Sequence, residues 1–149
     1  MKKIYLLVLI FSFFITALKA QEEKEVEKVI ATLFEGMKAK DGEKVQKLFH
    51  PDASMQTVIA EENGATLGSN SVSDFITRIS TVAEGTVLDE RILEYHIKID
   101  GHMASAWTPY EFYVSDSFSH CGVNSFQMIK TSDGWKITYV IDTRRKEGC

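Results

Sequence analysis

Hydrophobic residues in the first third of the chain recur at helical spacing. Val26, Ile30 and Leu33 fall on one face of a helix, while Glu and Lys occupy most positions between them. This pattern predicts an amphipathic helix that ends near Asp41-Gly42. A shorter stretch with the same spacing precedes Pro51, and the residue before a proline avoids helical angles. We therefore predict a second, short helix that ends before this proline.

The next segment predicts a β-hairpin followed by a third helix. Residues 53–60 and 65–67 look extended on either side of an Asn-Gly pair, which is a hairpin signal. Ser71, with Asp74 three residues later, matches the pattern of a helix start. Glu84-Gly85 is the predicted end of this helix.

The remainder of the chain predicts four long strands. Asp-Gly or Asp-Ser pairs, which favour turns, separate four extended segments: 87–99, 103–115, 119–131 and 135–142. The predicted order of elements is α-α-β-β-α-β-β-β-β. This order is typical of an α+β fold with a mostly antiparallel sheet and three helices.

Because side chains alternate across a strand, the four strands can be sorted into two faces. One face is apolar except for a few groups such as His120 and Asn124, whereas Glu111 and Asp142 fall on the opposite face. Aromatic walls with a few polar groups are typical of a small-molecule site. The alternative is a core whose polar groups bond to nearby backbone.

Nine residues are the predicted ligand contacts. They are Phe34, Met55, Tyr95, Trp107, Thr108, Tyr110, His120, Asn124 and Tyr139. Strict alternation places Trp107 outside, but Pro109 removes a backbone donor and could introduce a bulge that reverses the facing. Trp107 is therefore a candidate either for the pocket or for a subunit interface.

The start of the chain has the three parts of a secretion leader. Lys2-Lys3 precede an apolar run over 4–18, and the small Ala20 follows. The run is shorter than the roughly 20 residues that a transmembrane helix needs. We predict a signal peptide over 1–20, a single secreted or periplasmic domain over 21–149, and no membrane contact after cleavage. An uncleaved anchor is the alternative.

Charge and cysteines limit the partners. Loss of the leader removes three lysines and no acidic residue, which changes the net charge from −4 to −7. This charge argues against nucleic acid and anionic membranes as partners. Cys121 and Cys149 could form a disulfide in an oxidising compartment or stay free. No metal-ligand spacing is present, so we predict neither a metal nor a cofactor.

Two local motifs carry a family resemblance. Leu48-Phe49-His50-Pro51-Asp52-Ala53 and Asp133-Gly134-Trp135-Lys136-Ile137, together with the element order, resemble the nuclear transport factor 2-like superfamily. The similarity covers Glu22 to about Arg145 and is greatest to exported bacterial polyketide-cyclase-like or putative lumazine-binding domains. The resemblance implies a cone, in which a strongly curved sheet wraps around the long first helix and encloses a pocket. It also implies a homodimer through the outer sheet face.

These observations predict an exported domain that binds a small, largely apolar molecule. One alternative is a cofactor-independent isomerase, dehydratase or cyclase-like enzyme with His120 as general base, because His120 is the only base predicted to face inward. Another is a dimeric protein-interaction module whose cone is filled by side chains. The fold by itself does not choose between enzyme and binding protein.

Overall fold

The computed structural model describes the backbone of residues 2–149 and the side chains of residues 18–149. Most of the predicted leader falls on residues whose side chains lie outside the described part, so the cleavage after Ala20 stays a prediction. Within the described residues, no helix is long and apolar enough to cross a bilayer.

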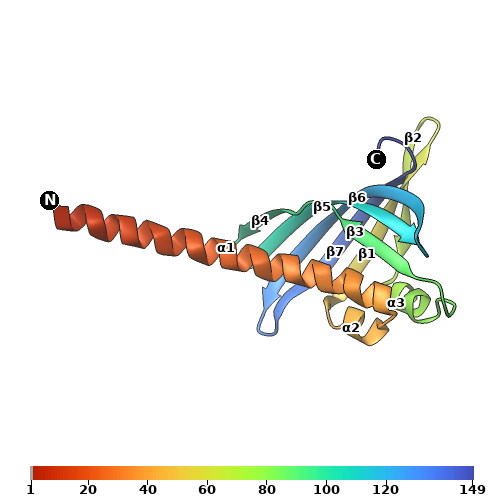
Figure 1. The fold of residues 1–149 in the computed structure, drawn as a ribbon, viewed down its shortest axis with the longest axis horizontal. Coiled ribbons are helices and arrows are strands. Elements are labelled where there is room, and N and C mark those ends of the chain that lie inside the picture. The colour runs from red at the N-terminus through yellow and green to blue at the C-terminus, as the bar shows by residue number, and fades with distance from the viewer. Residues whose placement is uncertain (1) are drawn as a thin grey trace.

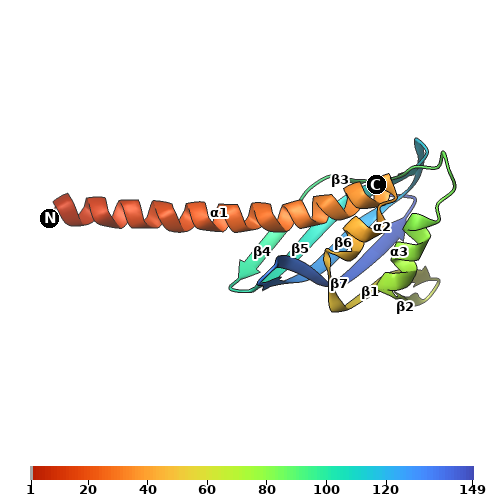
Figure 2. The same cartoon turned by 90° about the horizontal axis from the view of Figure 1, so that it is seen from below.

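The two predicted N-terminal helices are present. Helix α1 (Lys2–Ala39) continues without a break from the predicted leader, and α2 (Gly42–Gln46) follows after a short turn. Figures 1 and 2 show that the C-terminal half of α1 crosses one face of the sheet. Asp41 caps α2 by accepting a 2.9 Å hydrogen bond from the backbone N–H of Lys44, which satisfies a donor that the first helical turn leaves unpaired.

The rest of the described chain forms one mixed sheet and a third helix. The elements are β1 (Phe49–Glu61), β2 (Gly64–Asn70), α3 (Val72–Ser80), β3 (Leu88–Ile92), β4 (His96–Asp100), β5 (Met103–Val114), β6 (Ser117–Thr131) and β7 (Gly134–Arg145). The strand order is β2-β1-β7-β6-β5-β3, with β4 also paired to β5. Only β1 and β7 pair in parallel. The predicted α+β class with three helices is confirmed, although the sheet has seven strands where six were predicted, and α3 ends at Ser80, before the predicted Gly85.

The predicted strand 87–99 is divided into β3 and β4 by one extra residue. Ile92 pairs with Tyr110, and His96 pairs with Trp107. The chain therefore advances four residues from Ile92 to His96 while β5 advances only three, from Trp107 to Tyr110. An insertion of one residue reverses the facing of a strand. Glu90 consequently faces inward together with Ile92, although alternation along an unbroken strand would place it outside.

A second insertion of one residue changes the facing of β7. Ile137 pairs with Met128, whereas Tyr139 pairs with Gln127, which leaves Thr138 as a bulge. Beyond this bulge, Val140 and Asp142 face inward. The prediction that placed Tyr139 inside and Asp142 outside is therefore wrong, because it assumed unbroken alternation.

The core lies between α1 and the centre of the sheet. Ile30, Phe126, Met128 and Ile137 are fully buried, and the rings of Phe34 and Phe126 meet edge to face with centroids 6.4 Å apart. Burying each such side chain contributes about 1.5–3 kcal/mol. The sheet thus has a closed, apolar region beneath the helix.

The two cysteines are bonded to each other. Cys121 on β6 and Cys149 at the chain end form a disulfide across a sequence separation of 28, which confirms the bridged alternative. Cys121 is buried, so the bridge holds the C-terminal segment against the outer face of the sheet. A loop of this length corresponds to roughly 3 kcal/mol of stabilisation in the chain-entropy model.

Candidate functional site

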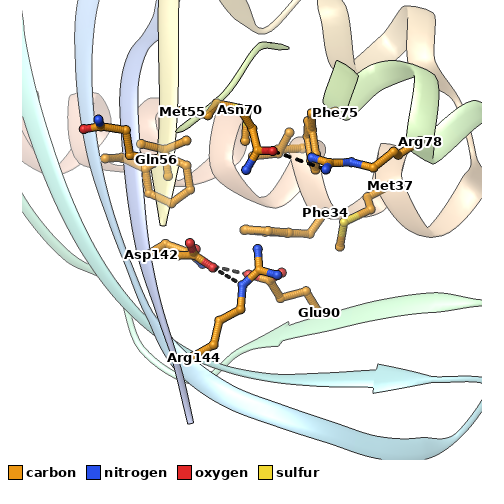
Figure 3. Close-up of a pocket in the computed structure, with 14 residues that line it drawn as sticks. Phe34, Met37, Met55, Gln56, Asn70, Phe75, Arg78, Glu90, Asp142 and Arg144 are labelled. Atoms are coloured by element: carbon orange, nitrogen blue, oxygen red, sulfur yellow. Dashed lines mark hydrogen bonds and ion pairs between the residues drawn. The ribbon is translucent and has the colours of Figure 1, made fainter. Parts of the chain in front are cut away.

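Two adjoining cavities open between α1, α3 and the inner face of the sheet. Figure 3 shows the residues that line the first of them. The first has a volume of about 80 Å³ and the second about 360 Å³. They share seven lining residues: Met37, Asn70, Phe75, Arg78, Glu90, Asp142 and Arg144. Because of this common wall, we treat the two cavities as one site, called the pocket below.

One wall of the pocket is apolar. Helix α1 contributes Leu33, Phe34 and Met37, because residues three and four apart share a helix face. Phe75 reaches the same space from α3, and Phe126 comes from the centre of the sheet. The apolar core described above therefore continues as the wall of the pocket.

Glu90 is the most perturbed acid of the pocket. Its Oε1 atom accepts a 2.7 Å hydrogen bond from the side-chain amide of Asn124. Burial, with a smaller contribution from the negative charge of Asp142, raises the pKa of Glu90 to about 8, although the bond from Asn124 acts in the opposite direction. The Glu90 carboxyl is accordingly neutral near pH 7 and can donate a hydrogen bond.

Asp142 and Arg144 follow each other on the inward face of β7. The Nε atom of Arg144 donates to Asp142 Oδ2 at 2.7 Å. Tyr110 donates from its hydroxyl to Thr143 O at 3.0 Å and lies 3.5 Å from the same Asp142 oxygen. Residue 122 is glycine at this point of the sheet: a Cβ atom there would overlap the carbonyl oxygen of Thr143 and would lie 2.9 Å from Tyr110 Cε1.

A third polar group comes from the opposite side of the pocket. Arg78 on α3 donates from Nη1 to Asn70 Oδ1 at 3.3 Å. Figure 3 shows that its guanidinium group and that of Arg144 both point into the pocket. The helix and the sheet thus each supply one cation.

His120 lies in the second cavity, beside Tyr110 and Phe112. Its ring centroid is 5.0 Å from that of Phe112 and 5.8 Å from that of Tyr110, and its Nδ1 atom is 3.1 Å from Ser119 Oγ. Burial, followed by the positive charge of Arg144, lowers the pKa of His120. The imidazole is therefore neutral near pH 7.

The pocket holds carboxylates, amides and guanidinium groups, but not in a metal-binding arrangement. Among the described side chains, no group of three or more His, Cys, Asp or Glu is placed to hold a metal ion. The arrangement can instead recognise hydrogen-bonding groups of an organic molecule, with neutral Glu90 as donor, Asp142 as acceptor and the arginines as cations.

Comparison with protein families assigns the chain. The model of the family described as "Putative lumazine-binding" matches residues 21–139, which is most of the sequence. The chain belongs to this putative lumazine-binding family. Among curated proteins, none matches the sequence.

Solved structures place this family member in the nuclear transport factor 2-like fold. A protein of this type with a cystatin-like fold from Novosphingobium aromaticivorans is 16% identical with a TM-score of 0.69, over 92% of this chain and 90% of that one. One of unknown function from Shewanella baltica is 19% identical with a TM-score of 0.63, over 86% and 97%.

A putative dehydratase of the same fold family, from Streptomyces avermitilis, is 15% identical with a TM-score of 0.66, over 85% of this chain and 98% of that one. Identities this low show the fold alone. The nuclear transport factor 2-like fold that the sequence predicts is therefore confirmed.

The predicted site residues of this family member are only partly brought together. Phe34, Met55 and Asn124 line the first cavity, and Tyr110 and His120 line the second. The remaining four lie elsewhere. Thr108 is fully buried beside Asn124, Tyr95 lines a shallow groove beyond Phe34, and Trp107 is exposed on the outer face. Tyr139 does not line the pocket itself, but its hydroxyl donates at 2.6 Å to Oε1 of Gln56, a residue of the first cavity.

Sequence reasoning missed the charged residues of the pocket. The two single-residue insertions turn Glu90 and Asp142 inward, and unbroken alternation could not predict this. Arg144 lies two residues after Asp142 and therefore on the same face of β7. Arg78 lies on α3 beside Ile79, which is buried, so helical spacing gave no sign that Arg78 points to a cavity. One sequence signal could have indicated Glu90. It lies on the same face of its strand as Leu88 and Ile92, and a charged residue between two apolar ones on one face is unusual.

Proposed function

We propose that this protein is an exported domain that binds a small, largely apolar molecule with a polar edge. The observation that carries the proposal is the convergence of Glu90, Asp142 and two arginines on a cavity whose other wall is aromatic. Apolar pockets with a few convergent polar groups are the usual form of small-molecule sites, and the second cavity has a volume within their range. A sheet that curves around α1 as a cone would enclose such a ligand.

The test is native mass spectrometry of protein purified after export. Wild-type protein should retain a small molecule that dissociates on denaturation. Met55→Trp would fill the first cavity, and the matched control Met103→Trp adds the same ring at an exposed site on the end of β5. Loss of the retained mass in Met55→Trp alone is the expected result. Equal retention in both variants would contradict the proposal.

A second candidate function is acid–base catalysis without a cofactor. It is favoured by Glu90, whose raised pKa of about 8 suits proton transfer near neutral pH, and by Asp142 beside it. The base would then be a carboxylate and not His120. The check is exchange of solvent deuterium into a panel of ketones with acidic α-protons, followed by NMR. Deuterium exchange that occurs with wild-type protein and is abolished by Glu90→Gln would support the enzyme. Exchange no faster than in buffer alone would contradict catalysis and favour the binding function.

Export and dimerisation complete the proposal. The disulfide supports maturation in an oxidising compartment, where such bonds persist. Trp107, with 52% of its surface exposed on the outer sheet face, supports a subunit contact there, because aromatic residues are enriched at interfaces. Sedimentation should give a dimer at micromolar concentration, and Trp107→Ala should shift it toward monomer.

A further inference from the structure

Two arginines stand on opposite sides of the pocket where it meets solvent. Arg78 from α3 and Arg144 from β7 line both cavities, and both residues are exposed. Figure 3 shows their guanidinium groups directed toward the same space beside the ring of Phe34. A ligand whose body lies against that ring would bring one end between the two cations.

Most of the hydrogen-bonding capacity of these arginines remains available. A guanidinium group has five N–H donors. Asp142 receives a bond from Nε of Arg144, and Asn70 receives one from Nη1 of Arg78. Within the described residues, the two terminal amino groups of Arg144 and four N–H groups of Arg78 donate to no protein acceptor.

The local charge is opposite to that of the whole chain. Two cations face one carboxylate, Asp142, because the Glu90 carboxyl stays neutral near pH 7. The chain as a whole has a net charge of −4. The pocket entrance therefore has a surplus of about one positive charge, which suits a singly charged anion better than a dianionic phosphate.

We propose that the ligand is an amphipathic carboxylic acid whose carboxylate lies between Arg78 and Arg144. Guanidinium groups bind carboxylates through two parallel hydrogen bonds. The apolar body of the acid would extend past Phe34 toward Phe75 and Phe126. This inference rests on the proposed function of the pocket as a small-molecule site.

The experiment compares acids with their neutral amides. Benzoate, 2-naphthoate and 4-phenylbutyrate each have an amide of nearly equal size, so a pair differs mainly in charge. Binding of all six probes to the exported protein is measured by isothermal titration calorimetry at pH 7. At least one acid should bind ten times or more tighter than its amide.

Variants assign the difference to the arginines. Arg144→Gln should weaken binding of the preferred acid about tenfold, and Arg78→Gln should weaken it severalfold, with the amide little affected. Arg145→Gln is the matched control, because it removes the same charge from the neighbouring residue on the opposite face of β7. It should leave both affinities unchanged. Thermal unfolding of each variant verifies that the domain is folded.

The possible outcomes separate this inference from the proposed function. Amides that bind as tightly as the acids, or a preference that survives both pocket substitutions, would overturn the carboxylate site while the pocket remains a small-molecule site. Failure of all six probes at millimolar concentration would contradict the proposed function and this inference together. Equal losses in Arg144→Gln and Arg145→Gln would assign the effect to general charge and would also overturn the carboxylate site.

Discussion

The inner face of the sheet has two regions that differ in kind. Beneath the C-terminal half of α1 it presents Phe126, Met128 and Ile137, all fully buried. On β3 and toward the end of β7 the same face presents Glu90, Asp142 and Arg144 around a cavity. A single residue inserted between β3 and β4 and another inserted in β7 separate the two regions.

This difference shows how one face of a sheet can contribute both to the stability of the fold and to ligand binding. Unbroken alternation along the strands would have turned Glu90 and Asp142 outward. A bulge costs one local ladder interaction but re-aims every side chain beyond it. The apolar region should therefore dominate the free energy of unfolding, while the charged region should dominate ligand affinity.

The largest expected effect comes from the apolar region. Phe126→Ala removes a fully buried ring that meets Phe34 edge to face, and it should lower the free energy of unfolding by about 3–5 kcal/mol. Urea denaturation followed by far-UV circular dichroism measures this change. A loss below about 1 kcal/mol would mean that this region is not the main source of stability.

The disulfide should have the next largest effect. Cys149→Ser opens the loop that ends at Cys121, and the free energy of unfolding should fall by roughly 3 kcal/mol in the chain-entropy model. Because Arg144 precedes the bridge by only a few residues, ligand binding should weaken as well. The same urea titration under non-reducing conditions checks the first effect, and no difference from wild type would contradict it.

Glu90→Gln should change how stability depends on pH. The folded protein keeps Glu90 protonated up to about pH 8, whereas the unfolded chain ionises it above its ordinary pKa of 4.5. In wild-type protein, the contribution of Glu90 to the free energy of unfolding is therefore fully present below pH 4.5 and is lost as the pH rises to 8. Glu90 lines an open cavity and part of its surface is exposed. Because solvent screening reduces the effect, we expect the loss to be about 2 kcal/mol.

Urea titrations at pH 4.5, 6 and 8 measure this dependence. Glu90→Gln should lack the decline that wild type shows, and Glu111→Gln on the outer face is the matched control. A decline of equal size in wild type and in Glu90→Gln would contradict the assignment.

The smallest stability effect is expected at His120. This side chain lines the second cavity and is only partly buried, so His120→Ala should change the free energy of unfolding by less than about 1 kcal/mol. Binding of a pocket ligand should weaken by about 1–3 kcal/mol if the imidazole bonds to it. Unfolding of the domain with unchanged ligand retention would instead make His120 a structural residue.

The fold was predictable from the sequence to a large extent, but the charges of the pocket were not. Helical spacing from Val26 to Leu33, the Ser71 cap and the turn pairs each depend on local geometry, which sequence patterns report directly. The facing of Glu90 and Asp142 depends on two bulges, and a bulge is selected by the packing of a whole strand. His120, Tyr110 and Asn124 were located because no bulge separates them from the apolar positions that fixed the register.

The most direct test of the two-region description is NMR of protein labelled with ¹⁵N, titrated with 2-naphthoate. The side-chain amide of Asn124 bonds to Glu90 inside the pocket, and that of Gln127 lies on the outer face of the same strand. Binding in the pocket should shift the Asn124 amide signals and leave those of Gln127 in place. Shifts at Gln127 without shifts at Asn124 would show that the molecule binds elsewhere and would contradict the assignment of the charged region as the site.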